Sequence, residues 1–65
     1  MKTAIAEKLI EARGSIPRAQ VAKDLGISIS AIQMYENGER IPRDEIKVKI
    51  AAYYHTTVQA LFFAC

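Results

Sequence analysis

The sequence is poor in several residue types that would point to other classes of protein. It holds one cysteine, Cys65, one histidine, His55, and no tryptophan. A lone cysteine excludes an intramolecular disulfide, which favours a reducing compartment, and the two residues together cannot supply the four ligands of a structural zinc site. No apolar run could span a bilayer, and Glu7, Lys8 and Glu11 interrupt any signal-peptide core. We therefore predict a cytoplasmic protein that holds no metal, no other cofactor and no membrane contact.

Catalytic signatures and excess charge are equally scarce. The sequence shows no Ser-His-Asp arrangement, Gly-rich phosphate loop or carboxylate pair, and 65 residues leave little room for a catalytic cleft, so we predict no enzyme. The formal net charge is only +2. It comes from residues 1–32, where five basic residues oppose three acidic ones, whereas four oppose four in residues 33–65. This excess permits a polyanionic partner without demanding one, and we interpret Lys23, Lys47 and Lys49 as solvated charges.

Apolar residues at helical spacing fill most of the chain. Hydrophobic residues make up 51% and charged residues 25% of the sequence, as in a folded globular protein. The predicted helices cover residues 3–13, 17–25, 28–36, 43–54 and 58–64. Thr3, Ser28 and Thr57 are the candidate N-caps, and no strand pattern occurs. We expect one all-α domain over residues 1–65, a compact bundle of five short helices.

The stretch from Arg18 to Gly38 is the most informative part of the sequence. Two short helical patterns flank Gly26, which can adopt the positive φ that a sharp reversal needs. Ala22 is small enough for two helices to cross closely. The apolar residues expected to pack this pair against the bundle are Val21, Leu25, Ile27, Ile32 and Tyr35. The pattern predicts a helix-turn-helix over residues 18–37, a motif that binds DNA.

The chain resembles the lambda-repressor/Cro (XRE) family of helix-turn-helix DNA-binding domains. The residues that carry the resemblance are Val21-Ala22, Leu25-Gly26-Ile27-Ser28, Ile32, Tyr35-Glu36-Asn37-Gly38, Pro42, Ile50-Ala51, Val58 and Leu61. It implies a homodimer that binds double-stranded DNA at a pseudo-palindromic operator. The second helix would cross the DNA backbone, and the third would lie in the major groove.

The resemblance also assigns roles to individual residues. The base-reading residues that it implies are Ile29, Ser30, Gln33 and Met34. A carboxamide such as that of Gln33 pairs with the N6 and N7 atoms of adenine, and an apolar side chain such as Ile29 contacts a thymine methyl group. The phosphate-contacting residues that it implies are Arg18, Ser28, Asn37, Arg40 and Arg43.

The sequence departs from the family pattern at the partner of Glu36. Members often pair this glutamate with an arginine late in the first helix, but Glu11 occupies that position here. Glu36 therefore needs another partner, and Arg13 and Arg40 are the candidates. The third helix also lacks charged residues on its expected reading face, so binding strength must come mostly from flanking basic residues.

The segment 57–65 is strongly apolar. Val58, Leu61 and Phe62 can close the core of the chain itself. Phe63 cannot share their direction, because neighbours on a helix are about 100° apart. We predict that Leu61, Phe62 and Phe63 form a two-fold dimer contact with the same segment of a second chain.

These observations predict a small transcriptional regulator, bacterial or phage-encoded and nucleoid-associated when bound to DNA. The simplest mechanism is repression by promoter occlusion as a homodimer, with no small-molecule ligand. Two alternatives stay open at this point. One is a protein-interaction module that kept the fold, such as an antitoxin-like or recombination accessory protein. The other is the DNA-binding portion of a longer regulator.

Overall fold

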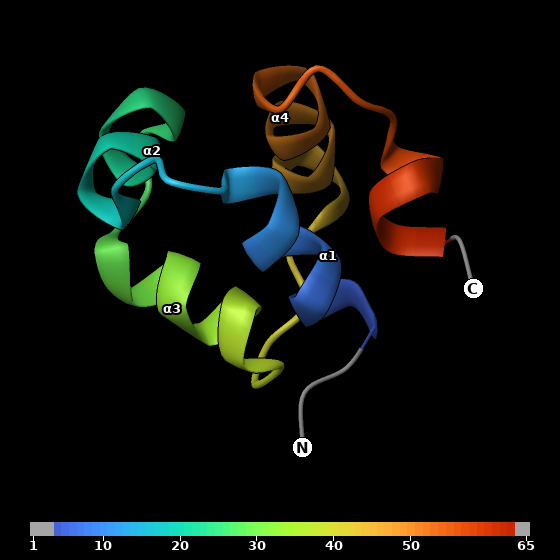
Figure 1. Cartoon of the computed structure of the whole chain (residues 1–65), viewed down its shortest axis with the longest axis horizontal. Helices are drawn as coiled ribbons and strands as arrows, with labels where there is room; N and C mark the ends of the chain where they lie inside the picture. Colours follow the sequence, from blue (N-terminus) through green and yellow to red (C-terminus); the bar gives the residue numbers. More distant parts are fainter. Residues whose placement is uncertain (1–3, 64–65) are drawn as a thin grey trace.

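The computed structural model describes residues 4–63, and within them the chain forms five helices (Figure 1). These are α1 (Ala4–Arg13), α2 (Arg18–Leu25), α3 (Ile29–Asn37), α4 (Asp44–Tyr53) and η1 (Gln59–Phe63). No strand occurs in this part of the chain, so the predicted all-helical bundle is confirmed. The expected cap at Thr3 and the cysteine at Cys65 lie outside the described residues.

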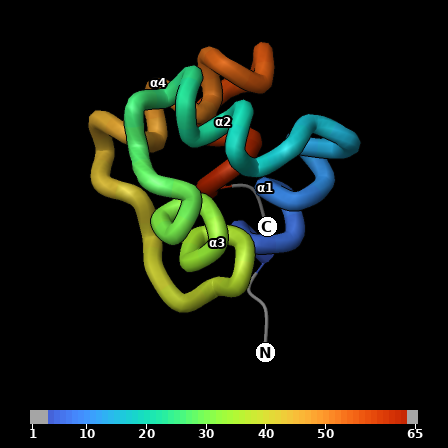
Figure 2. Tube along the Cα trace, turned by 90° about the vertical axis from the view of Figure 1, so that its left-hand side faces the viewer, coloured from blue at the N-terminus to red at the C-terminus, as the bar shows by residue number. Residues whose placement is uncertain are grey.

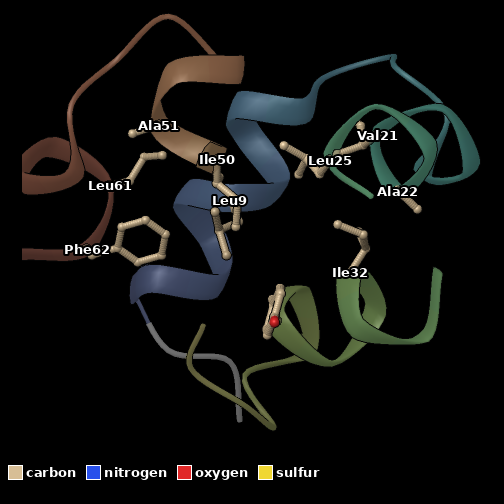
Figure 3. Packing of buried hydrophobic residues seen from close by; sticks show 10 residues of the cluster. Leu9, Val21, Ala22, Leu25, Ile32, Ile50, Ala51, Leu61 and Phe62 are labelled. Atoms are coloured by element: carbon tan, nitrogen blue, oxygen red, sulfur yellow. The ribbon is translucent and has the colours of Figure 1, made fainter. Parts of the chain in front are cut away.

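The helices pack as two groups that share one core. Helix α1 packs against α3 and η1, and α2 packs against α3 and α4 (Figures 1 and 2). In Figure 2 helices α2 and α3 face the viewer, with α1 and the last helix behind them. The buried cluster between them is drawn in Figure 3 and includes Leu9, Val21, Ala22, Leu25, Ile32, Tyr35, Ile50, Ala51, Leu61 and Phe62. Every helix contributes to this cluster, which fixes α2 and α3 on the rest of the bundle.

Helices α2, α3 and α4 are followed by the same C-capping motif. A residue in the left-handed region follows the helix, and the next N–H bonds to the carbonyl five residues back. Gly26 (φ 71°) and Gly38 (φ 77°) fill that position after α2 and α3, whereas His55 (φ 58°) fills it after α4. The closing bonds are Ile27 N to Ala22 O (3.0 Å), Glu39 N to Met34 O (2.9 Å) and Thr56 N to Ala51 O (2.9 Å).

Two helices begin at hydroxyl caps. The Oγ atom of Ser28 accepts from the Ala31 N–H (3.0 Å), and the Oγ1 atom of Thr57 accepts from the Ala60 N–H (3.0 Å), as their sequence positions predict. These bonds satisfy backbone donors that the first turn of a helix leaves without a partner. The turn geometry between α2 and α3 is therefore set by Gly26 at one side and Ser28 at the other.

The last helix, η1, is a π-helix where the sequence predicted an α-helix. A π-helix bonds residue i to i+5 and so holds more residues in each turn than the 3.6 of an α-helix. Neighbouring side chains are then closer together in angle. This geometry lets the adjacent residues Leu61 and Phe62 both enter the core, at 5% and 6% exposure, while Phe63 stays outside.

Among the described residues there is no helix with both the length and the apolar character that a bilayer crossing requires.

Candidate nucleic-acid interface

Helices α2 and α3 form a close pair joined by the turn at residues 26–28. Val21, Ala22 and Leu25 of α2 are buried, as are Ile32 and Tyr35 of α3. Ala22 is 3% exposed, in keeping with the small side chain that the crossing was predicted to need. Since these side chains are buried, the exposed residues Ile29, Ser30 and Gln33 form the opposite, solvent-facing side of α3.

The exposed face of α3 carries three of the four predicted base-reading residues. Ile29 is 47% exposed at the first turn, and Ser30 and Gln33 are exposed beside it. Met34 is half-buried, so it is turned partly toward the domain. None of these side chains is charged, and the one acidic residue of α3, Glu36, is buried. This face can offer hydrogen bonds and apolar contacts, but no ionic attraction of its own.

Three of the predicted phosphate-contacting residues lie together beside α3. Ser28, Arg40 and Arg43 line one pocket of about 250 Å³ between this helix and the loop that leads to α4. Both arginines are exposed. The Ser28 oxygen already accepts the Ala31 N–H, but a hydroxyl still has its own proton to donate. The pocket therefore presents two cations and one hydroxyl donor along one side of α3.

The other two predicted phosphate residues lie away from this pocket. Arg18 is the first residue of α2. Asn37, expected beyond the third helix, is instead the last residue of α3, because the left-handed residue that ends the helix is Gly38. The Asn37 Nδ2 atom lies 3.5 Å from Glu39 Oε1, a long hydrogen bond on the exposed surface.

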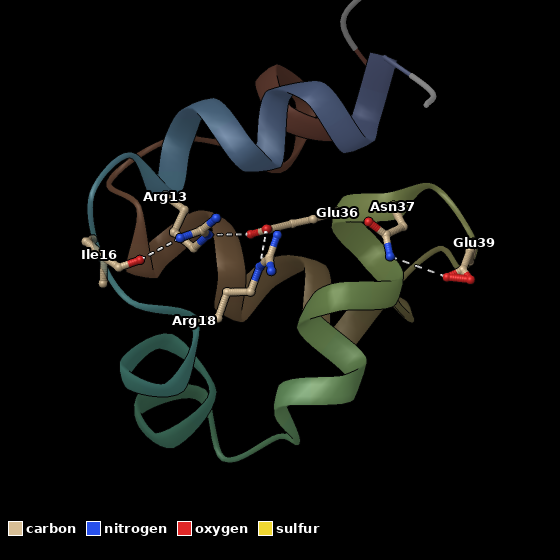
Figure 4. Close-up of polar contacts among 6 residues, drawn as sticks. All are labelled: Arg13, Ile16, Arg18, Glu36, Asn37 and Glu39. Atoms are coloured by element: carbon tan, nitrogen blue, oxygen red, sulfur yellow. Dashed lines mark hydrogen bonds and ion pairs between the residues drawn. The ribbon is translucent and has the colours of Figure 1, made fainter. Parts of the chain in front are cut away.

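A buried carboxylate connects α3 to the preceding helices (Figure 4). Glu36 is 2% exposed, and its Oε2 atom accepts from Arg13 Nε (2.7 Å) while its Oε1 atom accepts from Arg18 Nε (2.9 Å). Arg13 Nη1 also donates to the Ile16 carbonyl (2.8 Å). Of the two expected partners, Arg13 is confirmed. The expectation for Arg40 is wrong, because Glu36 pairs with Arg13 and Arg18, while Arg40 lines the exposed pocket with Ser28 and Arg43. Both carboxylate oxygens are thus satisfied by cations, as a buried charge requires.

The pairing of Arg18 with Glu36 was missed from the sequence. The two residues are 18 positions apart and belong to different helices, so no local spacing connects them. The family resemblance directs attention to the first helix, whereas Arg18 lies at the beginning of the second. The available signal was the Glu11 substitution, which removes the usual partner and leaves a buried carboxylate to be neutralised.

A second polar contact holds α2 against α4. The Tyr53 hydroxyl donates to Asp24 Oδ2 (2.6 Å), and Gln20 Nε2 donates to Asp24 Oδ1 (2.9 Å). The Tyr53 hydrogen bond, followed by that of Gln20, lowers the pKa of Asp24, and the same bond raises the pKa of Tyr53. Beside it, burial raises the pKa of Tyr54 to about 12. This contact fixes α2 against α4, as the pairing of Arg18 with Glu36 fixes it against α3.

The residues predicted to form a dimer contact divide into two groups. Leu61 and Phe62 pack inside the chain's own core, and only Phe63 is exposed, at 62%. Lys47, expected to be a solvated charge, instead covers both rings: its Nζ atom lies 5.5 Å from the centre of Phe62 and 5.0 Å from that of Phe63. Of the three residues predicted for the dimer contact, only Phe63 is therefore exposed to a second chain.

A comparison with protein families agrees with this architecture. A family model described as helix-turn-helix matches residues 5–61, which is most of the chain and includes all four α-helices but for the first residue of α1. Neither the search of curated proteins nor the search of solved structures found a match. The match and the arrangement of α2 and α3 lead to one conclusion: the chain belongs to the Cro/C1-type helix-turn-helix (XRE) family of DNA-binding domains.

Proposed function

We propose that this protein is a transcriptional repressor that binds a specific double-stranded DNA site and occludes a promoter. The observation that carries the proposal is the exposed, uncharged face of α3 together with cations on the neighbouring segments. Arg18 lies at the beginning of α2, and Arg40 and Arg43 line the pocket beside α3. Phosphate contacts supply affinity and register, whereas base edges supply specificity, so this division of side chains matches the two tasks.

In the proposed complex α3 enters the major groove and reads bases with its exposed residues. Gln33 pairs with an adenine, and Ile29 packs against a neighbouring thymine methyl group. Ser30 donates or accepts a single hydrogen bond and discriminates little. Met34, being half-buried, contacts the edge of the site through the part of its side chain that remains exposed.

The proposed repressor acts as a cytoplasmic homodimer on a pseudo-palindromic operator. Two-fold symmetry places the two α3 helices in successive major grooves, about one helical turn apart. Phe63 is the residue most exposed for a contact between the two chains, and Lys47 over its ring would be part of that contact. Sedimentation at high micromolar concentration tests this part, since a strict monomer would contradict it.

Selection of bound sites from random double-stranded DNA is the experiment that tests the function. We expect an enriched sequence with two-fold symmetry. Gln33→Ala should then lose roughly 1–3 kcal/mol of discrimination at one base pair of each half-site and leave the others unchanged. Gln59→Ala, which removes an exposed glutamine of η1, is the matched control. If the Gln33 variant keeps full discrimination at every position, Gln33 does not read a base.

The uncharged face of α3 also favours a second candidate, a protein-interaction module that kept the fold. Ile29 and Ile41 are both about half exposed, at 47% and 50%, and such side chains suit a protein partner. A gel shift with random DNA at low salt separates the two functions. Binding there, competed by a selected site, supports the repressor, whereas no binding to any DNA supports the interaction module.

A further inference from the structure

We propose that Glu36 is a positioning residue for DNA binding, which holds Arg18 by its Nε atom so that the Nη end of the guanidinium meets a phosphate. This inference rests on the proposed function, because it concerns how one of the phosphate contacts is formed. Glu36 itself touches no DNA in this arrangement. It acts through Arg18, whose side chain is 37% exposed while Glu36 is 2% exposed.

The geometry of the contact leaves most of the guanidinium for another acceptor. A guanidinium has five N–H donors in a rigid plane, and Glu36 Oε1 uses the one on Nε, at 2.9 Å. Among the described residues, Arg18 makes no second side-chain hydrogen bond. Because the plane is rigid, fixing Nε also fixes the direction of both Nη atoms. Arg18 is then oriented before the DNA arrives, and less side-chain entropy is lost on binding.

Arg13 makes this arrangement possible by anchoring the carboxylate. It is 16% exposed, donates from Nε to Glu36 Oε2 at 2.7 Å, and also bonds the Ile16 carbonyl. The three side chains together carry one excess positive charge (Figure 4). Glu36 is neutralised by Arg13 from inside the domain, so the second cation, Arg18, remains available to an anion outside. A carboxylate with Arg18 as its only partner would instead compete with the phosphate for the same charge.

The same geometry explains why a lysine should not replace Arg18. A lysine carries its charge on a single nitrogen at the end of a flexible chain. It can reach either Glu36 or a phosphate, but it has no separate donor at the Nε position with which to bond both in one fixed orientation. If Arg18 only supplied positive charge, the two residues would be equivalent.

The primary test compares Arg18→Lys with Arg18→Ala in DNA binding over a range of salt concentrations. We expect Arg18→Lys to weaken binding about tenfold, most of the loss seen with Arg18→Ala, and to lower the salt dependence by about one ion. Lys23→Arg is the matched control, since Lys23 is an exposed cation of the same helix and we interpret it as solvated. It should bind like the native protein. Unfolding curves confirm that each variant is folded at the assay temperature.

A double-mutant cycle tests the role of Glu36 directly. Arg18→Ala is expected to lose about tenfold in the native background but less than about threefold in the Glu36→Gln background, because the arginine is no longer oriented there. Equal losses in the two backgrounds would overturn the inference. So would tighter binding by Glu36→Gln, which would mean that the carboxylate only repels the DNA. If Glu36→Gln does not fold, the lysine comparison decides alone.

Different results would contradict the proposed repressor function and the positioning role of Glu36. If the native protein binds no DNA, the repressor function and this inference both fall. If the native protein binds a selected site and Arg18→Lys binds it equally well, DNA binding stands and only the positioning role of Glu36 is wrong. If Arg18→Lys is less stable but binds with native affinity, the contact with Glu36 is purely structural.

Discussion

The helix-turn-helix half of the domain, α2 and α3, is built differently from the closing half, α4 and η1. Both helices of the first half end at glycines in the left-handed region, and its one buried charge has two cationic partners. In the closing half, the left-handed residue that follows α4 and its cap Tyr54 is His55, with φ 58°. The last helix is a single π-helical segment that leaves the Phe63 ring 62% exposed, with a lysine over its face.

This difference indicates which half is fixed and which half can change. An interface that must place several side chains on DNA needs a rigid frame, and the first half supplies one with unstrained helix ends and a charge network. The closing half completes the core with Leu61 and Phe62, and it supplies none of the proposed base-reading residues. It touches proposed phosphate residues only where α4 begins, where Lys47 N bonds the Arg43 carbonyl and Ile46 lines the pocket of Arg40 and Arg43. Substitutions there should change stability or association without changing what is read. The following predictions test that division, in order of decreasing effect.

Loss of Glu36 should produce the largest effect. Glu36→Ala leaves the guanidinium of Arg13, itself only 16% exposed, without its carboxylate, and removing one partner of a buried pair costs roughly 3–5 kcal/mol. We expect denaturant unfolding to show a loss of that order, which is a large fraction of the stability of a domain of this size. Glu11→Ala, at an exposed site of α1, should change stability by no more than about 0.5 kcal/mol. Similar losses in the two variants would mean that the charge network does not fix the first half.

Enlarging Ala22 should have the next largest effect. This residue is 3% exposed between α2 and its neighbours, so Ala22→Leu forces the packed helices apart and should destabilise the fold by about 1–3 kcal/mol. Ala19→Leu adds the same atoms to an exposed site of the same helix and is the control. If thermal melts show no difference between them, the crossing is less close than the burial of Ala22 indicates.

A pair of substitutions at the helix ends should have opposite signs. His55→Gly relieves the left-handed conformation of a residue with a Cβ atom and should stabilise the fold by about 0.5–1 kcal/mol. Gly26→Ala should destabilise it by about the same amount. A Cβ atom at Gly26 would meet no atom within 4 Å, so this effect comes from the backbone alone. Chemical denaturation of both variants compares the strain in the two halves. If His55→Gly does not stabilise the fold, the end of α4 is unstrained.

The hydrogen bond from Tyr53 of α4 to Asp24 of α2, which joins the two halves, should give the smallest effect on stability, and that effect should depend on pH. This bond holds the pKa of Asp24 below the usual 3.8, so the contact stabilises the fold above that pH and is lost as the pH falls through the lowered value. Tyr53→Phe should return the pKa of Asp24 toward 3.8, as measured by NMR titration of its carboxyl carbon. Tyr54→Phe is the control and should leave Asp24 unchanged. An unshifted titration in the Tyr53 variant would show that Tyr53 does not link α4 to Asp24 in solution.

Local chemistry made the first half predictable. Gly26, Gly38 and Ser28 act through their own backbone or their nearest neighbours, and their spacing placed α2 and α3 correctly. The exposure of Phe63 was also predicted, although from the residue spacing of an α-helix, whereas η1 is a π-helix. In contrast, contacts between distant residues leave no spacing in the sequence. Arg18 with Glu36 and Asp24 with Tyr53 are of this kind.

Two further features of the closing half were not predicted, namely the left-handed residue after α4 and the π-helical geometry of η1. The position after α4 favours glycine, yet histidine occupies it, so nothing in the sequence marked the left-handed turn at His55. The π-helical geometry of η1 accompanies the burial of two adjacent side chains, Leu61 and Phe62, in the core, and no residue of the segment marks it in the sequence. Neither property belongs to the segment by itself.

The charge-free face of α3 has a consequence for how discrimination responds to the surrounding solution. On the proposed mode of binding, the arginines at the sides of α3 displace the same counterions whether the DNA carries the operator or not. The contacts of Ile29, Ser30 and Gln33 displace none. Raising the ionic strength should therefore weaken binding to the operator and to random DNA in parallel, so that the ratio of the two affinities stays nearly constant. Such a protein would dissociate from operator and random DNA over the same range of salt concentration, while its preference among sequences would not change.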